Sequence, residues 1–176
     1  KAGKKIVFVN FSGSAIALTP ESKTCDAILQ AWYPGQAGGT AIANVLFGDY
    51  NPAGRLPVTF YKSTSQLPGF EDYSMKGRTY RYMTEAPLFP FGHGLSYTTF
   101  RYGDASLSTQ EVKDGEQTIL TIPVSNAGER DGEEVVQVYL RRPGDKEGPS
   151  HALRAFKRVN IARGVTSNVT VSLSKE

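Results

Sequence analysis

The chain has 176 residues, a formal net charge of +3 and 21% charged residues, which is the composition of an ordinary globular protein of one domain or two small ones. No run of about eighteen apolar residues occurs, so no membrane-spanning helix is predicted. Lys1, Lys4 and Lys5 account for the excess charge, and nucleic-acid binding, which needs a clustered basic face, is not predicted. The opening apolar run is too short for a signal peptide, so none is expected.

Residues 1–61 are expected to form part of an α/β layer. The runs "KKIVFVNF" and "DAILQAWY" are continuously apolar, which is typical of strands buried on both faces. Pro34 and Gly35 end the second run, and "GTAIANVLF" then has apolar residues at helical spacing. Gly48 suits the left-handed position after a helix. "RLPVTFY" is expected to return as an extended piece, and the whole is too small for a complete α/β domain.

Residues 62–100 have little periodicity and many aromatic residues, prolines and glycines. This composition is too aromatic for a flexible linker. We expect a long ordered connection that packs its rings against other surfaces, some of them outside this chain.

Residues 101–176 are expected to form an all-β, immunoglobulin-like sandwich. Apolar residues alternate with polar ones in "QTILTIPVSNAG", "EEVVQVYLRRPG", "LRAFKRVNIARG" and "SNVTVSLS", and turn residues separate the runs. With "RYGDASLS" the sequence predicts about five strands, where a sandwich of this type has about seven. Two strands are therefore expected to be missing.

The glycine-rich stretch "WYPGQAGGTAIANVLF" has the outline of a phosphate-binding loop. A P-loop needs a lysine directly before its Ser or Thr, and no lysine precedes Thr40. The dinucleotide-binding spacing of glycines is also absent. We interpret Gly35, Gly38 and Gly39 as shaping a tight strand–turn–helix connection.

Two groups of side chains are candidates for catalytic or binding residues. Glu71 and Asp72 are adjacent, so in an extended chain they point to opposite sides and do not flank one glycosidic bond; pairing with solvent, Arg78 or Arg81 is favoured. The aromatic residues could stack on a sugar ring, but core or interface packing is favoured for all of them: Trp32, Tyr73, Tyr80 and Tyr82.

The remaining reactive residue types form no predicted site. A structural hydrogen bond is favoured for His93, and solvation for His151. Cys25 is the only cysteine and is expected to be a buried structural thiol. No metal-ligand spacing joins these residues, no cofactor is predicted, and "SGSA" at Ser12 is not a nucleophile elbow.

The runs "DAILQAWYPGQAGGTAIANVLFGDYNPAGRLPVTFY", "GRTYRY" and "PLFPFGHGLSYTTF" resemble the C-terminal region of glycoside hydrolase family 3. "VSNAGERDGEEVVQVYL" is similar to the fibronectin type III-like domain of that family. The resemblance covers nearly all of the chain and is strongest to the β-xylosidase branch, some of whose enzymes also release arabinose. β-Glucosidases share the "FPFGHGLSYT" pattern.

The resemblance implies retaining hydrolysis in two steps, with a nucleophilic aspartate on an N-terminal (β/α)₈ barrel and an acid/base glutamate on the α/β sandwich. Neither carries over, because the barrel segment is absent and Glu21 follows the segment that the family glutamate precedes. We therefore expect no catalytic residue in this chain. Residues 1–61 would complete a three-layer α/β/α sandwich, and residues 101–176 a fibronectin type III-like sandwich without its last strands.

The resemblance also implies a setting for the complete enzyme: oligosaccharide substrate, a periplasmic or extracellular location, and a homo-oligomer as one possibility. Two readings of the chain stay open. It completes the acid/base domain of an exo-acting β-glycosidase, or it is a non-catalytic module that binds saccharide or protein. We expect the chain alone not to fold as a monomer with a complete first domain, because its apolar strands lack neighbours.

Overall fold

The computed structural model describes residues 3–174. The chain divides into two compact units. The first contains the residues up to Tyr50 together with Leu56–His93, and the second contains Asn51–Arg55 together with the residues from Gly94 onward. The short segment Asn51–Arg55 thus leaves the first unit and belongs to the second.

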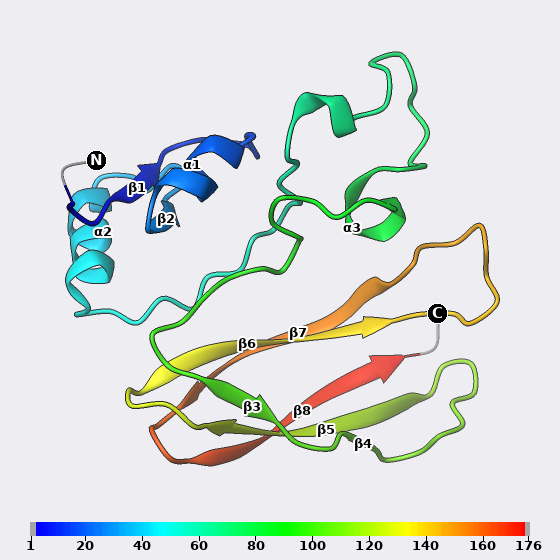
Figure 1. Ribbon diagram of the computed structural model, residues 1–176. Coiled ribbons are helices and arrows are strands. Elements are labelled where there is room, and N and C mark those ends of the chain that lie inside the picture. Colours follow the sequence, from blue (N-terminus) through cyan, green and yellow to red (C-terminus); the bar gives the residue numbers. More distant parts are fainter. Residues whose placement is uncertain (1–2, 175–176) are drawn as a thin grey trace. The chain divides into compact units, whose positions relative to one another are not determined.

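The first unit begins with a small parallel pair of strands. β1 (Val7–Asn10) pairs with β2 (Ala27–Gln30). Parallel strands need a crossover, and the connection between them contains α1 (Thr19–Thr24). This is the predicted α/β element, drawn in blue in Figure 1. The strands are less buried than predicted, and Val7 is 47% exposed. Parallel strands are normally covered on both faces, and among the described residues β1 has only β2 as a neighbour.

The predicted helix after the glycine-rich turn is α2 (Gly38–Phe47). Gly48 follows it with φ +84°, the left-handed conformation that glycine adopts without steric cost, and its N–H bonds the carbonyl of Val45. The helix therefore ends where the sequence predicted.

The connector is ordered but mostly irregular. It contains the 3₁₀-helix η1 (Thr64–Gln66) and the single-turn helix α3 (Thr79–Tyr82). The run "RLPVTFY" forms no strand within the described residues; only Phe60 pairs, in an isolated antiparallel bridge with Phe89. Pro57 has no N–H to donate to a ladder, which is consistent with this minimal pairing.

The second unit contains a two-sheet β-sandwich, as predicted. Its first sheet is built on β5 (Gln117–Asn126), which pairs antiparallel with β8 (Thr166–Ser174) along most of its length and with two short strands, β3 (Phe100–Tyr102) and β4 (Ser106–Leu107). The second sheet pairs β6 (Gly132–Leu140) with β7 (Ala152–Ile161).

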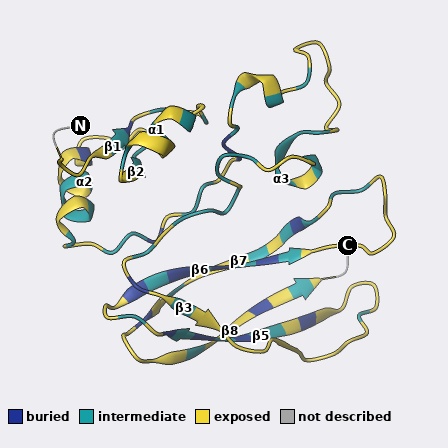
Figure 2. Ribbon diagram, in the orientation of Figure 1, coloured by how far each residue is buried: buried dark blue, intermediate teal, exposed yellow. Residues whose placement is uncertain are grey.

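The core of the sandwich comes from alternate positions of facing strands. Figure 2 shows buried positions alternating with less buried ones along β6. The most deeply buried apolar side chains are those of Val124, Val136, Ile161 and Val169. The run "RYGDASLS", predicted as one strand, is two. Gly103 lies between them, and a Cβ there would be 3.2 Å from the Pro123 ring, which suits the small glycine at this close approach.

Candidate functional site

Trp32, the aromatic residue at the head of the glycine-rich turn, packs within the first unit. Its backbone has φ +55°, an uncommon conformation for a bulky residue. Its ring meets Phe60 edge-on with centroids 6.0 Å apart, and Phe60, 1% exposed, meets Phe89 at 6.4 Å. These edge contacts are the geometry of core packing, as predicted for Trp32.

The connector tyrosines do not share one environment. Tyr80 is half-buried and stacks on Phe91, with ring centroids 4.3 Å apart. Tyr82 is also half-buried, whereas Tyr73 is 89% exposed. Tyr80 therefore packs as predicted, whereas core packing is excluded for Tyr73, for which interface packing stays a prediction. Its loop carries no apolar neighbour that covers the ring among the described contacts.

Glu71 and Asp72 are both exposed. The Asp72 carboxylate accepts a hydrogen bond from the backbone N–H of Ser74 at 2.8 Å, and this bond is the main reason that the pKa of Asp72 is lowered. Arg78 does not pair with the carboxylates as a bidentate partner; it donates to the backbone carbonyls of Asp72 and Ser74. The Asp72 carboxylate supports a turn, and as an exposed, ionised group it is not arranged as a proton donor.

The two histidines are both packed against aromatic rings. His93 stacks on Phe89 at 5.4 Å, and its backbone carbonyl accepts a hydrogen bond from Leu56. The predicted solvation of His151 is wrong: it is half-buried, lies 5.3 Å from the Tyr139 ring and hydrogen-bonds Ser150 through Nδ1. It immediately precedes β7, whose first residues pair with the strand that carries Tyr139.

Two of the three glycines in the glycine-rich turn, Gly35 and Gly38, have the predicted structural role, and Gly39 does not. Gly35 has φ +70°. A Cβ on Gly38 would lie 2.6 Å from the Pro34 ring, whereas one on Gly39 would meet nothing within 4 Å. Cys25 is half-buried rather than buried, with Sγ 3.9 Å from Thr24 Oγ1. Within residues 3–174, no group of three or more His, Cys, Asp or Glu side chains could hold a metal ion.

One polar centre that was not predicted from the sequence lies in the second unit. Arg55 Nη2 donates to Glu134 Oε2 at 2.6 Å, and the two side chains are only 13% and 10% exposed. Tyr102 donates its hydroxyl to Glu134 Oε1, also at 2.6 Å. Arg55 Nη1 reaches the carbonyl oxygens of Ala53 and Gly54 at 3.3 and 3.1 Å.

This centre keeps the phenol of Tyr102 protonated. Burial is the largest cause that raises the pKa of Tyr102, followed by its hydrogen bond to Glu134 and the charge of Glu134, while the charge of Arg55 opposes them. The phenol therefore stays protonated and donates. Both carboxylate oxygens of Glu134 accept hydrogen bonds from Arg55 and Tyr102, so this centre stabilises the fold and leaves no oxygen for a reactant.

A signal for this centre was present in the sequence. Glu134 falls on the same face of its strand as Val136 and Val138, which are core residues. A charged side chain on the core-facing side of a strand requires a buried partner. The identity of that partner, 79 positions earlier in the chain, could not be read from local spacing.

Two family profiles match the chain. The profile for the "Glycosyl hydrolase family 3 C-terminal domain" matches residues 1–97, and the profile for the "Fibronectin type III-like domain" matches residues 134–176. Similar curated proteins include a "Xylan 1,4-beta-xylosidase" of Xylanibacter ruminicola, 57% identical over 99% of this chain. A "Periplasmic beta-glucosidase" of Salmonella typhimurium is 38% identical over 99% of the chain.

The chain spans 20% of the first of these relatives and 24% of the second. Among solved structures, β-glucosidase 3B from Thermotoga neapolitana in complex with glucose matches with a TM-score of 0.86 and 33% identity. That match covers 98% of this chain and 26% of the other. The similarity therefore extends through both units of this chain but over about a quarter of each relative.

Proposed function

The chain belongs to glycoside hydrolase family 3, and from that premise we propose that the complete protein is an exo-acting retaining β-glycosidase. We assign it as a β-xylosidase that releases terminal non-reducing β-linked sugars from plant-derived oligosaccharides. The observation that supports this assignment is the 57% sequence identity with the xylan β-xylosidase over 99% of this chain.

Within that enzyme, this chain supplies scaffold rather than reacting groups. Retaining hydrolysis needs two carboxyl groups about 5–5.5 Å apart with room for the sugar between them. Glu134 has both oxygens engaged, and Asp72 lies exposed in a turn. We therefore propose that the nucleophilic aspartate and the acid/base glutamate lie in the part of the protein that precedes this chain.

Three parts of the chain have separate roles in this proposal. Residues 1–61 belong to the α/β sandwich domain, residues 62–100 form the aromatic-rich connector, and residues 101–176 form the fibronectin type III-like sandwich. The profile matches to residues 1–97 and 134–176 support this division in outline. Asn51–Arg55 lies within residues 1–61 in the sequence but belongs to the second compact unit.

A periplasmic or extracellular location is proposed, with oligosaccharide as the substrate and self-association as a further possibility. A relative named as periplasmic supports the location. No helix within residues 3–174 is long and apolar enough to cross a membrane.

The test compares the complete protein with the 176-residue chain on aryl β-xyloside and aryl β-glucoside. The complete protein is expected to hydrolyse the xyloside with the higher kcat/KM, and the chain alone is expected to be inactive. A higher kcat/KM on the glucoside would make the enzyme a β-glucosidase, an alternative supported by the Salmonella and Thermotoga relatives. Turnover by the chain alone would overturn the scaffold assignment.

A further inference from the structure

We propose that residues 69–78 form a docking loop, which inserts Phe70 and Tyr73 into apolar pockets on the part of the complete protein that precedes this chain. The proposal rests on the proposed function in one respect, that a longer glycosidase polypeptide exists. It adds a specific internal interface and the two side chains that anchor it.

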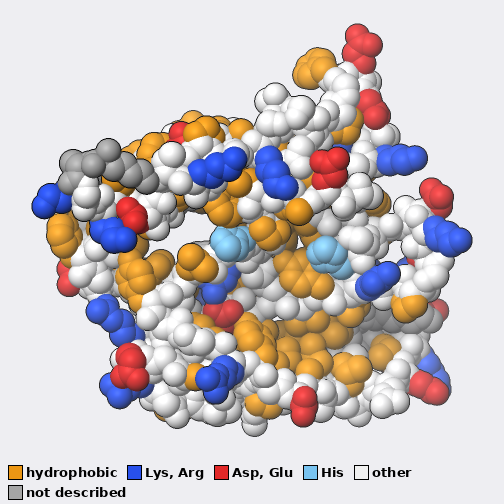
Figure 3. Space-filling model, in the orientation of Figure 1, with side chains coloured by type: hydrophobic (Ala, Val, Ile, Leu, Met, Phe, Trp, Pro, Cys, Tyr) orange, Lys and Arg blue, Asp and Glu red, His pale blue; other side chains and the backbone are white. Residues whose placement is uncertain are grey.

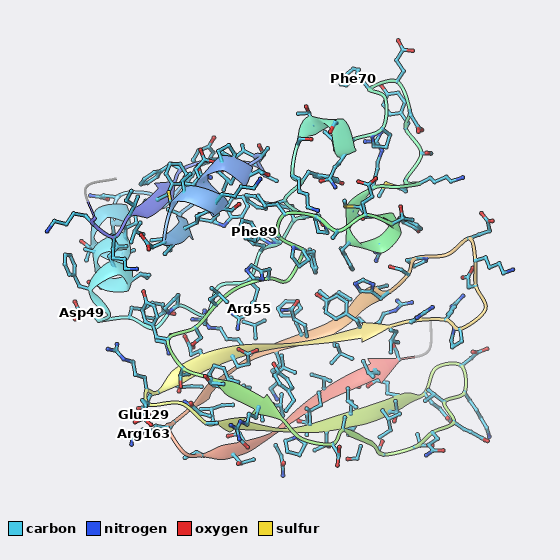
Figure 4. The ribbon with its side chains drawn as sticks, in the orientation of Figure 1. Asp49, Arg55, Phe70, Phe89, Glu129 and Arg163 are labelled. Carbon is cyan, nitrogen blue, oxygen red and sulfur yellow. The ribbon has the colours of Figure 1, made fainter. Side chains whose placement is uncertain are left out.

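The loop presents two aromatic rings that this chain leaves uncovered. Phe70 is 95% exposed and Tyr73 is 89% exposed. Phe70 lies at the tip of the loop in Figure 4, and Figure 3 shows hydrophobic and acidic side chains together at this tip. Exposed apolar side chains that are grouped together, as these two rings are on one loop, mark interaction sites.

Hydrogen bonds within the loop hold its backbone in place. Arg78 donates to the carbonyl oxygens of Asp72 and Ser74, and the Asp72 carboxylate accepts from the N–H of Ser74. The backbone N–H of Asp72 bonds the carbonyl of Gly69 at 3.0 Å, and that of Arg78 bonds Met75 at 3.0 Å. A loop already ordered in its binding shape loses little conformational entropy when it docks.

The side chains on the loop define the surface that it fits. Aromatic anchors placed in pockets dominate the energetics of protein interfaces, and charged residues at their edge set orientation. Glu71 and Asp72 lie between the two rings and are exposed. The complementary surface therefore has two apolar pockets bordered by lysine or arginine.

The rest of the same polypeptide is the occupant that these observations favour. The chain accounts for only 20% of the length of its xylosidase relative, so most of the protein's surface lies outside it. Sugar-binding sites are concave, whereas Phe70 stands at an exposed loop tip and Tyr73, three residues later, is also exposed, which suits insertion into a partner. A covalently connected partner is also present at high effective concentration.

The test places a photo-cross-linking phenylalanine analogue at position 73 of the complete protein, with a second sample modified at position 70. Lys76, exposed in the same loop, is the matched control position. Irradiation is expected to join position 73, and separately position 70, to a peptide that precedes this chain in the same molecule, with little product from position 76. A product of twice the mass would instead identify a second copy as the occupant and overturn the proposal, as would the absence of product at both ring positions.

A second measurement uses the double substitution Phe70→Ser and Tyr73→Ser. Cleavage by trypsin after Lys76 in the folded complete protein is expected to become about tenfold faster, because undocking raises the population of the cleavable loop. Phe156→Ser, which alters an exposed ring on β7, should leave this rate unchanged. Unchanged cleavage in the double variant would contradict docking.

The same samples are assayed on aryl β-xyloside and aryl β-glucoside. A cross-link without glycosidase activity would refute the proposed function and leave the docking loop in place. Activity without a cross-link would refute the docking loop and leave the proposed function in place.

Discussion

Arg55 and Glu134 are 79 positions apart in the chain and form an ion pair of 2.6 Å that is largely shielded from water. Arg55 lies in the short segment that separates two parts of the first unit, and Glu134 lies on the inner face of β6. The pair therefore joins Asn51–Arg55 to the β-sandwich, and the sandwich as a folding unit begins earlier in the chain than its first strand.

Substitution Glu134→Gln should destabilise the sandwich by about 3 kcal/mol, because it leaves the Arg55 guanidinium shielded from water without its counter-charge. Hydrogen exchange of the β6 amides in the complete protein measures this loss. The control is Glu129→Gln, which removes the ion pair with Arg163. Those side chains are 83% and 61% exposed, so its cost should stay below about 1 kcal/mol. Figure 4 labels both control residues. Equal losses of stability in the two variants would show that burial does not strengthen the Arg55–Glu134 ion pair.

Substitution Tyr102→Phe should lower stability at neutral pH by about 1 kcal/mol, since one oxygen of Glu134 loses its donor. The folded state raises the pKa of Tyr102 above the unfolded value of about 10. The stabilisation from this phenol is therefore complete below about pH 10 and decreases as the pH rises further, because the unfolded state then releases the proton first.

The stability difference between wild type and Tyr102→Phe should thus stay constant up to about pH 10 and narrow above it. Pulse proteolysis in urea with an alkaline subtilisin measures both proteins across this range. A difference that stays constant to about pH 11.5 would mean that the phenol is not protected from ionisation in the fold.

Substitution Gly94→Ala should cost about 1–3 kcal/mol. Its new methyl group would lie 2.2 Å from the carbonyl oxygen of Gly54 and 2.9 Å from Cδ of Arg55, so the Asn51–Arg55 segment must move. Gly54→Ala is the matched control, because a Cβ there meets nothing within 4 Å. Hydrogen exchange of the β6 amides should separate the two variants, and similar protection in both would refute the steric argument.

The 176-residue chain alone should not behave as a folded monomer. Its first unit exposes apolar side chains on β1 and at the end of α2, including those of Val7 and Phe47. Gel filtration with light scattering is expected to show association or aggregation rather than a single species of 19.2 kDa. A monomer with one cooperative thermal transition would show that the first unit is complete by itself.

The sequence predicted the regular elements best where local patterns determine them. α2 and its terminal glycine follow from helical spacing and the left-handed preference of Gly48, and β5 to β8 follow from alternation. The short helices α1 and α3 were missed. Proline in the first turn of α1 was an available signal, but a one-turn helix such as α3 is formed by its surroundings.

The contacts that could not be predicted from the sequence are those that depend on distant partners. The position of Glu134 on the core-facing side of its strand indicated that a buried partner exists, but not that this partner is Arg55. His151 was expected in water because its neighbours in sequence are polar, and it lies against Tyr139 because strand pairing brings them together. Tyr73 was expected to pack in a core or at an interface; its ring is 89% exposed within residues 3–174, so core packing is excluded and interface packing stays a prediction.

The second unit is built from two separate segments of the chain, which limits how its β-sandwich can be exchanged between relatives. A chimaera that takes its β-sandwich from a relative and joins it near residue 94 would inherit Glu134 and Tyr102 from one parent and Arg55 from the other. Such an exchange should succeed only if both parents carry the same polar centre, or if residues 51–55 are transferred with the sandwich. A β-sandwich should therefore be exchanged together with both of its segments, residues 51–55 and the residues from Gly94 onward.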